Sequence, residues 1–322
     1  MPTGPALPST TEPITLGALS DPILVDPGPR LLRAVVDAYR EAAPALVEPS
    51  VADLAGEAGE AGEAGEAGEA GEAGEAGDED DLGRSRSLPA LKVFAGESAV
   101  DAATAGFRSA SRFAALDDTD AMDLRVLDAP QSNAVLADDE TGFALIESDG
   151  AGESDEATDE GVRWHRVGDD ASLRERYASR FADAEPYRLR TPSRRRVYEG
   201  FAARCDESVA AAVLRALDAE VDADSVGPAG PDPEGTRVRA YAVGAREGVL
   251  DRTLRRACED AGLGSPSTFT RIKRLLREAD LIETASESQP VGRPRERLAA
   301  RGALAAAETP EETAAAVRGV TE

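Results

Sequence analysis

One stretch of fourteen residues limits the structures that the C-terminal part of this chain can adopt more than any other segment. Residues 264–277, GSPSTFTRIKRLLR, carry four basic side chains and no acidic one, in a chain of 322 residues with a net charge of −26. Ser265 is a preferred N-cap and Pro266 suits the first helical position, so a helix is expected to begin here. Apolar residues recur at helical spacing and predict one buried stripe. They are Phe269, Ile272, Leu275 and Leu276.

The opposite face of this expected helix, residues 265–279, collects the polar and basic side chains. A recognition helix needs this arrangement, because one face docks on its domain while hydroxyls and arginines reach phosphates and base edges in the major groove of DNA. An ordinary amphipathic surface helix is the alternative interpretation. The candidate DNA-binding residues of the helix are Ser267, Thr268, Thr270, Arg271, Lys273, Arg274 and Arg277.

The segment that follows has the pattern of strand, loop and strand. Its loop, PVGRPR, presents Arg293 and Arg295 between turn residues. A basic hairpin beside a recognition helix is the layout of a wing, which we place at residues 287–297. Arg293 and Arg295 therefore join the candidate DNA-binding residues.

The charges are distributed unevenly along the chain. Of 36 basic residues only Lys92 and Lys273 are lysines, against 62 acidic residues. This composition is typical of halophilic archaeal proteins, in which carboxylates hold water at high salt, so the acidity does not by itself indicate a basic partner. Residues 236–322 hold 15 basic and 13 acidic side chains, a net of +2, whereas residues 1–235 have a net of −28. The excess of acidic residues is therefore confined to residues 1–235.

Composition also divides the chain into segments. Residues 1–20 are rich in proline, serine and threonine and predict a disordered tail. Residues 21–218 alternate strand and helix patterns, which favours an α/β N-terminal domain. Residues 219–235 form a Pro-Gly-rich acidic linker, and residues 236–322 form the C-terminal domain.

A low-complexity insertion lies inside the N-terminal domain, at residues 50–88. The triplet Ala-Gly-Glu occurs seven times from Ala55 to Glu75. The repeat contains no proline, which argues against a collagen helix, and frequent glycine disfavours an α-helix. We expect a flexible acidic loop.

The N-terminal domain lacks the motifs of common enzymes. It has no glycine-rich phosphate loop, no His-Glu-x-x-His and no nucleophile elbow. The single histidine, His165, lies beside the single tryptophan, Trp164; the pair either lines a ligand pocket or belongs to a strand with an inward aromatic. Cys205 and Cys258 are expected to be free thiols. We predict no enzyme, no cofactor and no metal, and a cytoplasmic chain without a membrane span or signal peptide.

Several motifs resemble one family. ACEDAGLGSPSTFTRIKRLLREADLIET resembles the winged helix-turn-helix of archaeal and bacterial regulators. Together with VGRPRERL, YRLRTPSRRR and VFAGESAVDAATAGFRSASRFAAL, it makes most of residues 21–300 similar to haloarchaeal transcriptional regulators of the TbsP family. The resemblance implies an α/β N-terminal domain, a C-terminal DNA-binding domain and a role in the transcriptional control of metabolism. The Ala-Gly-Glu insertion and the acidic loop near residue 155 depart from the family.

The sequence thus predicts an α/β N-terminal domain followed by a C-terminal winged helix-turn-helix domain. The predicted function is a DNA-binding transcriptional regulator, with double-stranded DNA and a second copy of the chain as partners, and a small-molecule effector at the N-terminal domain as a further candidate. The alternative is an adaptor whose winged helix binds an acidic protein partner. A gel-shift assay distinguishes the two.

Overall fold

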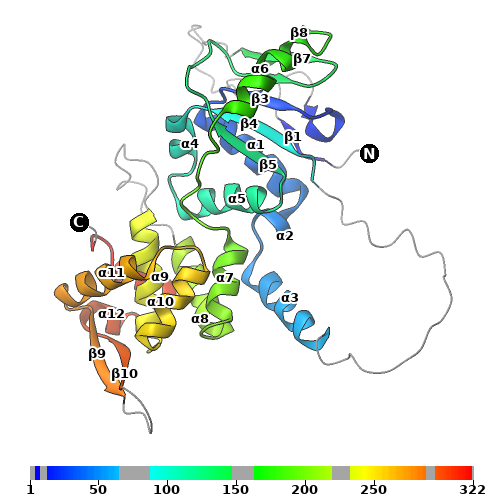
Figure 1. The fold of residues 1–322 in the computed structure, drawn as a ribbon. Helices are drawn as coiled ribbons and strands as arrows, with labels where there is room; N and C mark the ends of the chain where they lie inside the picture. Colours follow the sequence, from blue (N-terminus) through cyan, green and yellow to red (C-terminus); the bar gives the residue numbers. More distant parts are fainter. Residues whose placement is uncertain are drawn as a thin grey trace, which may run out of the picture. The chain divides into compact units, whose positions relative to one another are not determined.

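The computed structural model describes residues 4–7, 13–64, 88–146, 163–219, 233–287 and 294–320. Figure 1 shows the chain, which divides into two compact units. Unit 1 comprises Met1–Glu97 and Thr119–Tyr187, and unit 2 comprises Ser98–Asp118 and Arg188–Glu322. The expected linker lies mostly outside the described residues, and the division assigns residues 188–218 to the C-terminal helices.

Unit 1 is built on a mixed sheet of six strands among the described residues, in the order β5-β4-β3-β6-β7-β8. Strands β3, β4 and β5 are parallel, whereas β6, β7 and β8 join them by antiparallel pairing. Helical crossovers connect parallel strands and hairpins connect antiparallel ones, so the alternating pattern of the sequence leads to this mixture. The strands are β3 (Ile23–Val25), β4 (Leu91–Ala95), β5 (Met122–Val126), β6 (Val135–Ala137), β7 (Gly142–Ile146) and β8 (Arg163–Gly168).

Helices cover both faces of this sheet. On one face, α6 (Ser172–Asp183) packs Tyr177 and Phe181 against strand residues such as Val25 and Phe94. Figure 1 shows α1 (Pro29–Ala42) on the other side of the sheet. All three residues of β3 are buried because the strand is covered on both faces, which is the usual environment of a central parallel strand.

The N-terminal segment differs from the disordered tail that its composition predicts. Strand β1 (Ala6–Leu7) pairs with β2 (Ile14–Thr15), and a 3₁₀ helix (Leu16–Ala18) follows. Leu7 and Leu16 are completely buried. Two well-placed leucines give this short segment a hydrophobic anchor that its average composition conceals.

The beginning of the Ala-Gly-Glu insertion is also more ordered than predicted. Helix α2 (Pro44–Val47) is followed by α3 (Val51–Ala64), which extends into the repeat, so the expectation that glycine prevents a helix is wrong for these residues. Ser50 and Asp53 cap its start, because the Ser50 amide donates to Asp53 at 2.8 Å and the Asp53 amide donates to Ser50 Oγ at 3.2 Å. This cap, the buried Leu54 and the helix-forming alanine and glutamate residues outweigh the glycines. Residues 65–87 lie outside the described residues.

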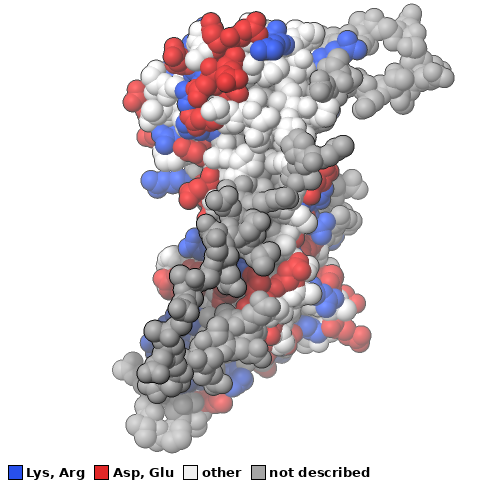
Figure 2. All heavy atoms as spheres, turned by 90° about the vertical axis from the view of Figure 1, so that its right-hand side faces the viewer, with Lys and Arg blue, Asp and Glu red and all other residues white. Residues whose placement is uncertain are grey.

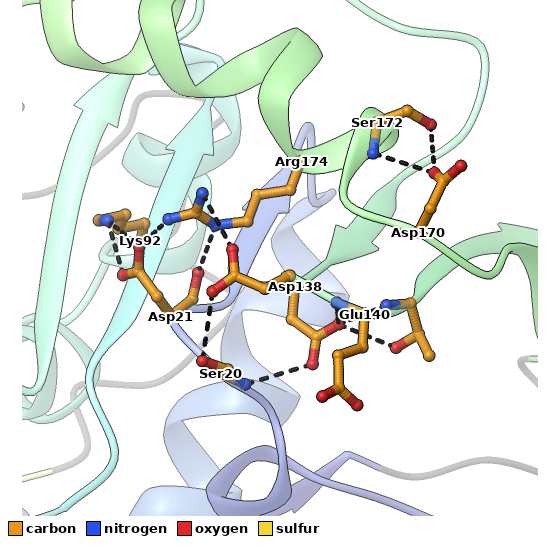
Figure 3. Close-up of polar contacts among 10 residues, drawn as sticks. Ser20, Asp21, Lys92, Asp138, Glu140, Asp170, Ser172 and Arg174 are labelled. Atoms are coloured by element: carbon orange, nitrogen blue, oxygen red, sulfur yellow. Dashed lines mark hydrogen bonds and ion pairs between the residues drawn. The ribbon is translucent and has the colours of Figure 1, made fainter.

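A polar cluster ties the segment before β3 to the β6–β7 turn and to α6 (Figure 3). Lys92 Nζ donates to both carboxylate oxygens of Asp21, at 2.6 and 2.7 Å, and Arg174 pairs with the same carboxylate. Asp138 Oδ1 accepts from the amides of Glu140 and Thr141, at 3.0 and 2.6 Å. Both cations of the cluster are thus paired with Asp21, and backbone amides satisfy Asp138, which indicates a structural role.

The pKa of Asp138 gives a prediction for unit 1. Burial works against its charge, but the hydrogen bonds from Glu140, Thr141 and Ser20 outweigh burial and hold its pKa below the ordinary value. A lowered folded-state pKa stabilises the fold above the unfolded value of about 4, and this stabilisation disappears as the pH falls through the folded value. We therefore expect Asp138→Asn to lower the urea midpoint at neutral pH, and the difference from wild type to shrink in acid. A difference that is unchanged below about pH 3 would contradict this.

Unit 2 consists mainly of helices and includes α7 (Arg194–Ala202) and α8 (Glu207–Asp218), which the sequence patterns placed in the N-terminal domain. The cause is the close approach of α7 to α10 (Asp251–Asp260). A Cβ placed on Gly200 of α7 would lie 2.5 Å from the amide nitrogen of Ala261. The other helices of the unit are α4 (Glu97–Ala103), whose first residue belongs to unit 1, α5 (Phe107–Asp118), α9 (Pro233–Arg246), α11 (Pro266–Glu278), α12 (Gly302–Ala306) and α13 (Pro310–Ala316).

Candidate nucleic-acid interface

Helix α11 begins where the sequence predicts. Ser265 is its N-cap, with a side chain that accepts a hydrogen bond from the Thr268 amide, and Pro266 occupies the first helical position. The turn that leads from α10 into α11 contains Gly262 at φ +74° and Gly264 at φ +154°. Residues other than glycine rarely adopt these backbone conformations, so glycine is required for the chain to reverse between the two helices.

The inner face of α11 is fixed to the unit. Phe269, Ile272 and Leu276 are completely buried. The ring of Phe269 stacks on Tyr241 of α9, with 5.9 Å between the ring centroids. Leu275, the fourth residue of the predicted stripe, is only half-buried. Three anchors are sufficient to set the orientation of the helix, so the residues of its outer face have defined positions.

Four predicted residues lie exposed on one outer face of α11. Ser267, Thr270, Arg274 and Arg277 follow one another at intervals of three and four residues, so they form a row along the helix. The side chain of Arg274 is 67% exposed, and its Nε lies 3.9 Å from a carboxylate oxygen of Glu278, the last residue of α11. Thr268 is half-buried and its hydroxyl lies 3.2 Å from Ser265 Oγ, within the cap.

The other two basic residues of the prediction are held by carboxylates from distant segments. Arg271 pairs with Glu234 of α9. Lys273 is only 14% exposed, and its Nζ lies 2.5 Å from Glu296 and 3.4 Å from Asp251. Both residues border the apolar stripe, where neighbouring elements reach them. In this structure their charges are therefore not available on the outer face.

A hairpin follows α11. Strands β9 (Ile282–Glu287) and β10 (Arg295–Ala300) pair antiparallel. The Leu298 amide donates to the carbonyl oxygen of Val249 at 3.2 Å, which ties the hairpin to the turn between α9 and α10. Arg295 is exposed in β10 opposite Glu287, whereas Arg293 lies outside the described residues. Of the two arginines predicted for the wing 287–297, the structure describes Arg295 alone, which lies in strand β10.

Two residues of α10 that sequence reasoning missed lie against α11. Asp251 is only 3% exposed, and its carboxylate accepts hydrogen bonds from the Tyr241 hydroxyl at 2.5 Å and from Arg255 Nη2 at 2.7 Å. Burial and this hydrogen bond raise the pKa of Tyr241, so the phenol stays protonated and donates. Arg255 Nη1 also donates to Thr270 Oγ1 at 3.2 Å. The spacing of Asp251 and Arg255, four residues apart on one helix, was the available signal.

Charged side chains of both signs lie interspersed on the face of the molecule drawn in Figure 2. Ion pairs also join separate elements of unit 2, such as Arg204 with Asp260 at 2.5 Å and Arg215 with Glu311 at 3.0 Å. Pairs of this kind on the surface stabilise a fold only slightly.

Unit 1 offers less indication of a site. Trp164 is buried and the adjacent His165 is exposed, as successive residues of a strand must point to opposite faces, so the two do not line one pocket. Within the described ranges, no group of three or more histidine, cysteine or acidic side chains could hold a metal ion. No helix in that part of the chain is long and apolar enough to cross a bilayer.

Two family models match the chain. Residues 80–192 match the N-terminal domain of TbsP-like transcriptional regulators, and residues 193–318 match their C-terminal HTH domain. The chain carries both domains of the TbsP-like transcriptional regulators. The TbsP-like HTH domain begins at Ser193, which is the N-cap of α7, so its range includes α7 and α8 as well as α9 to α11. No curated protein and no solved structure matches this TbsP-like chain.

Proposed function

We propose that the chain is a DNA-binding transcriptional regulator whose helix α11 enters the major groove, with the β9–β10 hairpin acting as a wing. The observation that supports this most directly is the outer row of α11. Ser267, Thr270, Arg274 and Arg277 are exposed on a helix whose inner face is anchored by three buried residues. In a chain of net charge −26, this helix carries a single acidic residue, Glu278 at its end. Hydroxyls and arginines at such positions can bind phosphates and base edges.

The wider proposal follows from the TbsP-like family and from the size of one HTH domain. One such domain reads few base pairs, so we propose a homodimer on paired half-sites, which light scattering on the full chain tests. We also propose genes of metabolism as targets, an effector bound by the N-terminal domain, a regulatory rather than enzymatic role, and action in the cytoplasm, where a prokaryotic chromosome lies. Arg295, and Arg293 beyond the described residues, would contact the neighbouring groove or backbone.

Arg274 provides the test of the recognition helix. The side chain of Arg274 is 67% exposed, against 33% for Arg271 and 14% for Lys273. Arg274 is therefore the candidate for a bidentate contact with guanine, which discriminates against a wrong base by about 1–3 kcal/mol. We expect Arg274→Ala to weaken binding to duplexes enriched from a random pool by the wild-type chain far more than binding to scrambled duplexes. The gap should persist at high salt, since counterion release contributes little there.

The matched control is Arg163→Ala, which removes an exposed arginine from β8 of unit 1 and should leave both affinities unchanged. Equal losses on enriched and scrambled duplexes would make Arg274 a phosphate contact rather than a base reader. A wild-type chain that enriches no duplex and binds none would instead contradict the regulator proposal and favour an adaptor for an acidic protein.

A further inference from the structure

Helix α10 brings a third arginine to the outer row of α11. Arg255 lies between two anchors: Nη2 donates to Asp251 at 2.7 Å, and Nη1 donates to Thr270 Oγ1 at 3.2 Å. Thr270 is a member of the outer row, and its hydroxyl in turn donates to the carbonyl oxygen of Pro266 at 2.9 Å. The guanidinium group of Arg255 is therefore located at the side of the proposed DNA-binding face, although its Cα belongs to another helix.

The anchor behind Arg255 is itself immobilised. The carboxylate of Asp251 is buried and accepts from the Tyr241 hydroxyl of α9, while Lys273 of α11 lies 3.4 Å away. Donors from three helices thus converge on one carboxylate. An arginine held by such a group loses little further side-chain freedom when it binds a ligand, which favours binding.

Arg255 also keeps donors for a ligand. A guanidinium group has five N–H groups. Nη1 and Nη2 each use one of their two in the bonds above, and Nε is buried without a partner among the described residues. The side chain is 31% exposed. One N–H on each terminal nitrogen thus remains for an acceptor outside the fold.

We propose that Arg255 is a DNA-contacting residue that binds a backbone phosphate, and that Asp251 is the positioning residue that directs it there. This inference rests on the proposed function of α11. Phosphate is the acceptor that fits, because it takes single charge-assisted hydrogen bonds from many directions. A bidentate contact with guanine needs two N–H groups aligned with a base edge inside the groove. Arg255 is held at the side of the outer row by Asp251 and Thr270 and is 31% exposed, against 67% for Arg274, so the DNA backbone is nearer to it than the base edges. Arg255 therefore contributes to affinity on every sequence.

The first test compares Arg255→Ala and Arg255→Lys in the full chain, on the enriched and scrambled duplexes described above. We expect Arg255→Ala to weaken binding about tenfold on both, and to reduce the slope of log affinity against log salt by about 0.9, the value for one phosphate. Arg255→Lys keeps the charge but cannot reach Asp251 and Thr270 together, so it should lose most of the same affinity. The control is again Arg163→Ala.

The outcomes distinguish this inference from the function on which it rests. If the wild-type chain binds DNA and Arg255→Ala has the same affinity and the same salt slope, the phosphate contact is wrong but the proposed function stands. Loss on the enriched duplex only would make Arg255 a base reader and would also overturn it. Wild-type affinity in Arg255→Lys would overturn the need for positioning. Failure of the wild type to bind either duplex would remove the proposed function itself.

A double-mutant cycle tests Asp251 separately. We expect Asp251→Asn to weaken binding and lower the salt slope in the wild-type background, but to have little further effect when Arg255 is already alanine. A purely structural role for Asp251 would give equal losses in both backgrounds and would leave the salt slope unchanged, which contradicts the proposal. Circular dichroism at the assay temperature shows which variants are folded. If Asp251→Asn is unfolded, Arg255→Lys decides whether Arg255 must be positioned.

Discussion

Replacing Phe269 with alanine is expected to destabilise unit 2 by about 3–5 kcal/mol. Phe269 is completely buried, stacks on Tyr241 and is the first of the three anchors that hold α11. Removing the ring leaves a cavity at the joint between α9 and α11. A loss of this size is a large fraction of the stability of an ordinary domain, so we expect DNA binding to fall together with the helical signal. Urea unfolding followed by circular dichroism at fixed salt measures the change.

Leu275→Ala is the matched control for this prediction. It removes an apolar side chain from the same helix, but one that is only half-buried, so the loss should be clearly smaller. Equal losses from Phe269→Ala and Leu275→Ala would show that α11 does not depend on its inner anchors. In that case the defined position of the outer row would need another explanation.

Gly200→Val is expected to destabilise unit 2 by about 3 kcal/mol or more, at the upper end of the cost of overpacking. A Cβ at this position would lie 2.5 Å from the nitrogen and 2.7 Å from the Cα of Ala261, and these backbone atoms cannot swing aside as a flexible side chain can. Helices α7 and α10 would have to separate. Because α10 also carries Asp251, the separation would disturb the anchor behind α11, and DNA affinity should fall with stability.

A graded series tests whether the close approach is the cause. Gly200→Ala should cost less than Gly200→Val, and Gly17→Ala should cost little, because nothing lies within 4 Å of a Cβ at the exposed Gly17. Thermal unfolding by circular dichroism ranks the three variants. A valine variant as stable as wild type would mean that α7 is not packed on α10 in solution, and that residues 188–218 are independent of the C-terminal helices.

The sequence was most informative where burial and capping act within one helix. The N-cap Ser265 and three of the four apolar residues predicted to be buried in α11 follow from neighbours in the chain, and the structure confirms them. The alternating strand and helix patterns of residues 21–218 also correspond to elements such as β3, because a short apolar run between turn residues leaves few other conformations. Local free energies dominate in these segments.

Composition was misleading where a few residues outweigh an average. The N-terminal segment is rich in proline, yet Leu7 and Leu16 are buried and anchor it. The Ala-Gly-Glu repeat is rich in glycine, yet the cap formed by Ser50 and Asp53 starts a helix that continues into it. The average composition of twenty residues does not show that one or two single residues make a stabilising contact.

What the sequence by itself determined is the outer row of α11, because the spacing of its apolar residues decides which side faces outward. What only the tertiary structure decided is which charges remain on that face. Lys273 is drawn to Asp251 and Glu296, Arg271 is drawn to Glu234, and Arg255 arrives from α10. The partners come from helix α9, helix α10 and strand β10, and no local pattern contains them. An ion pair depends on the distance between two groups in space, which exists only after the elements have packed.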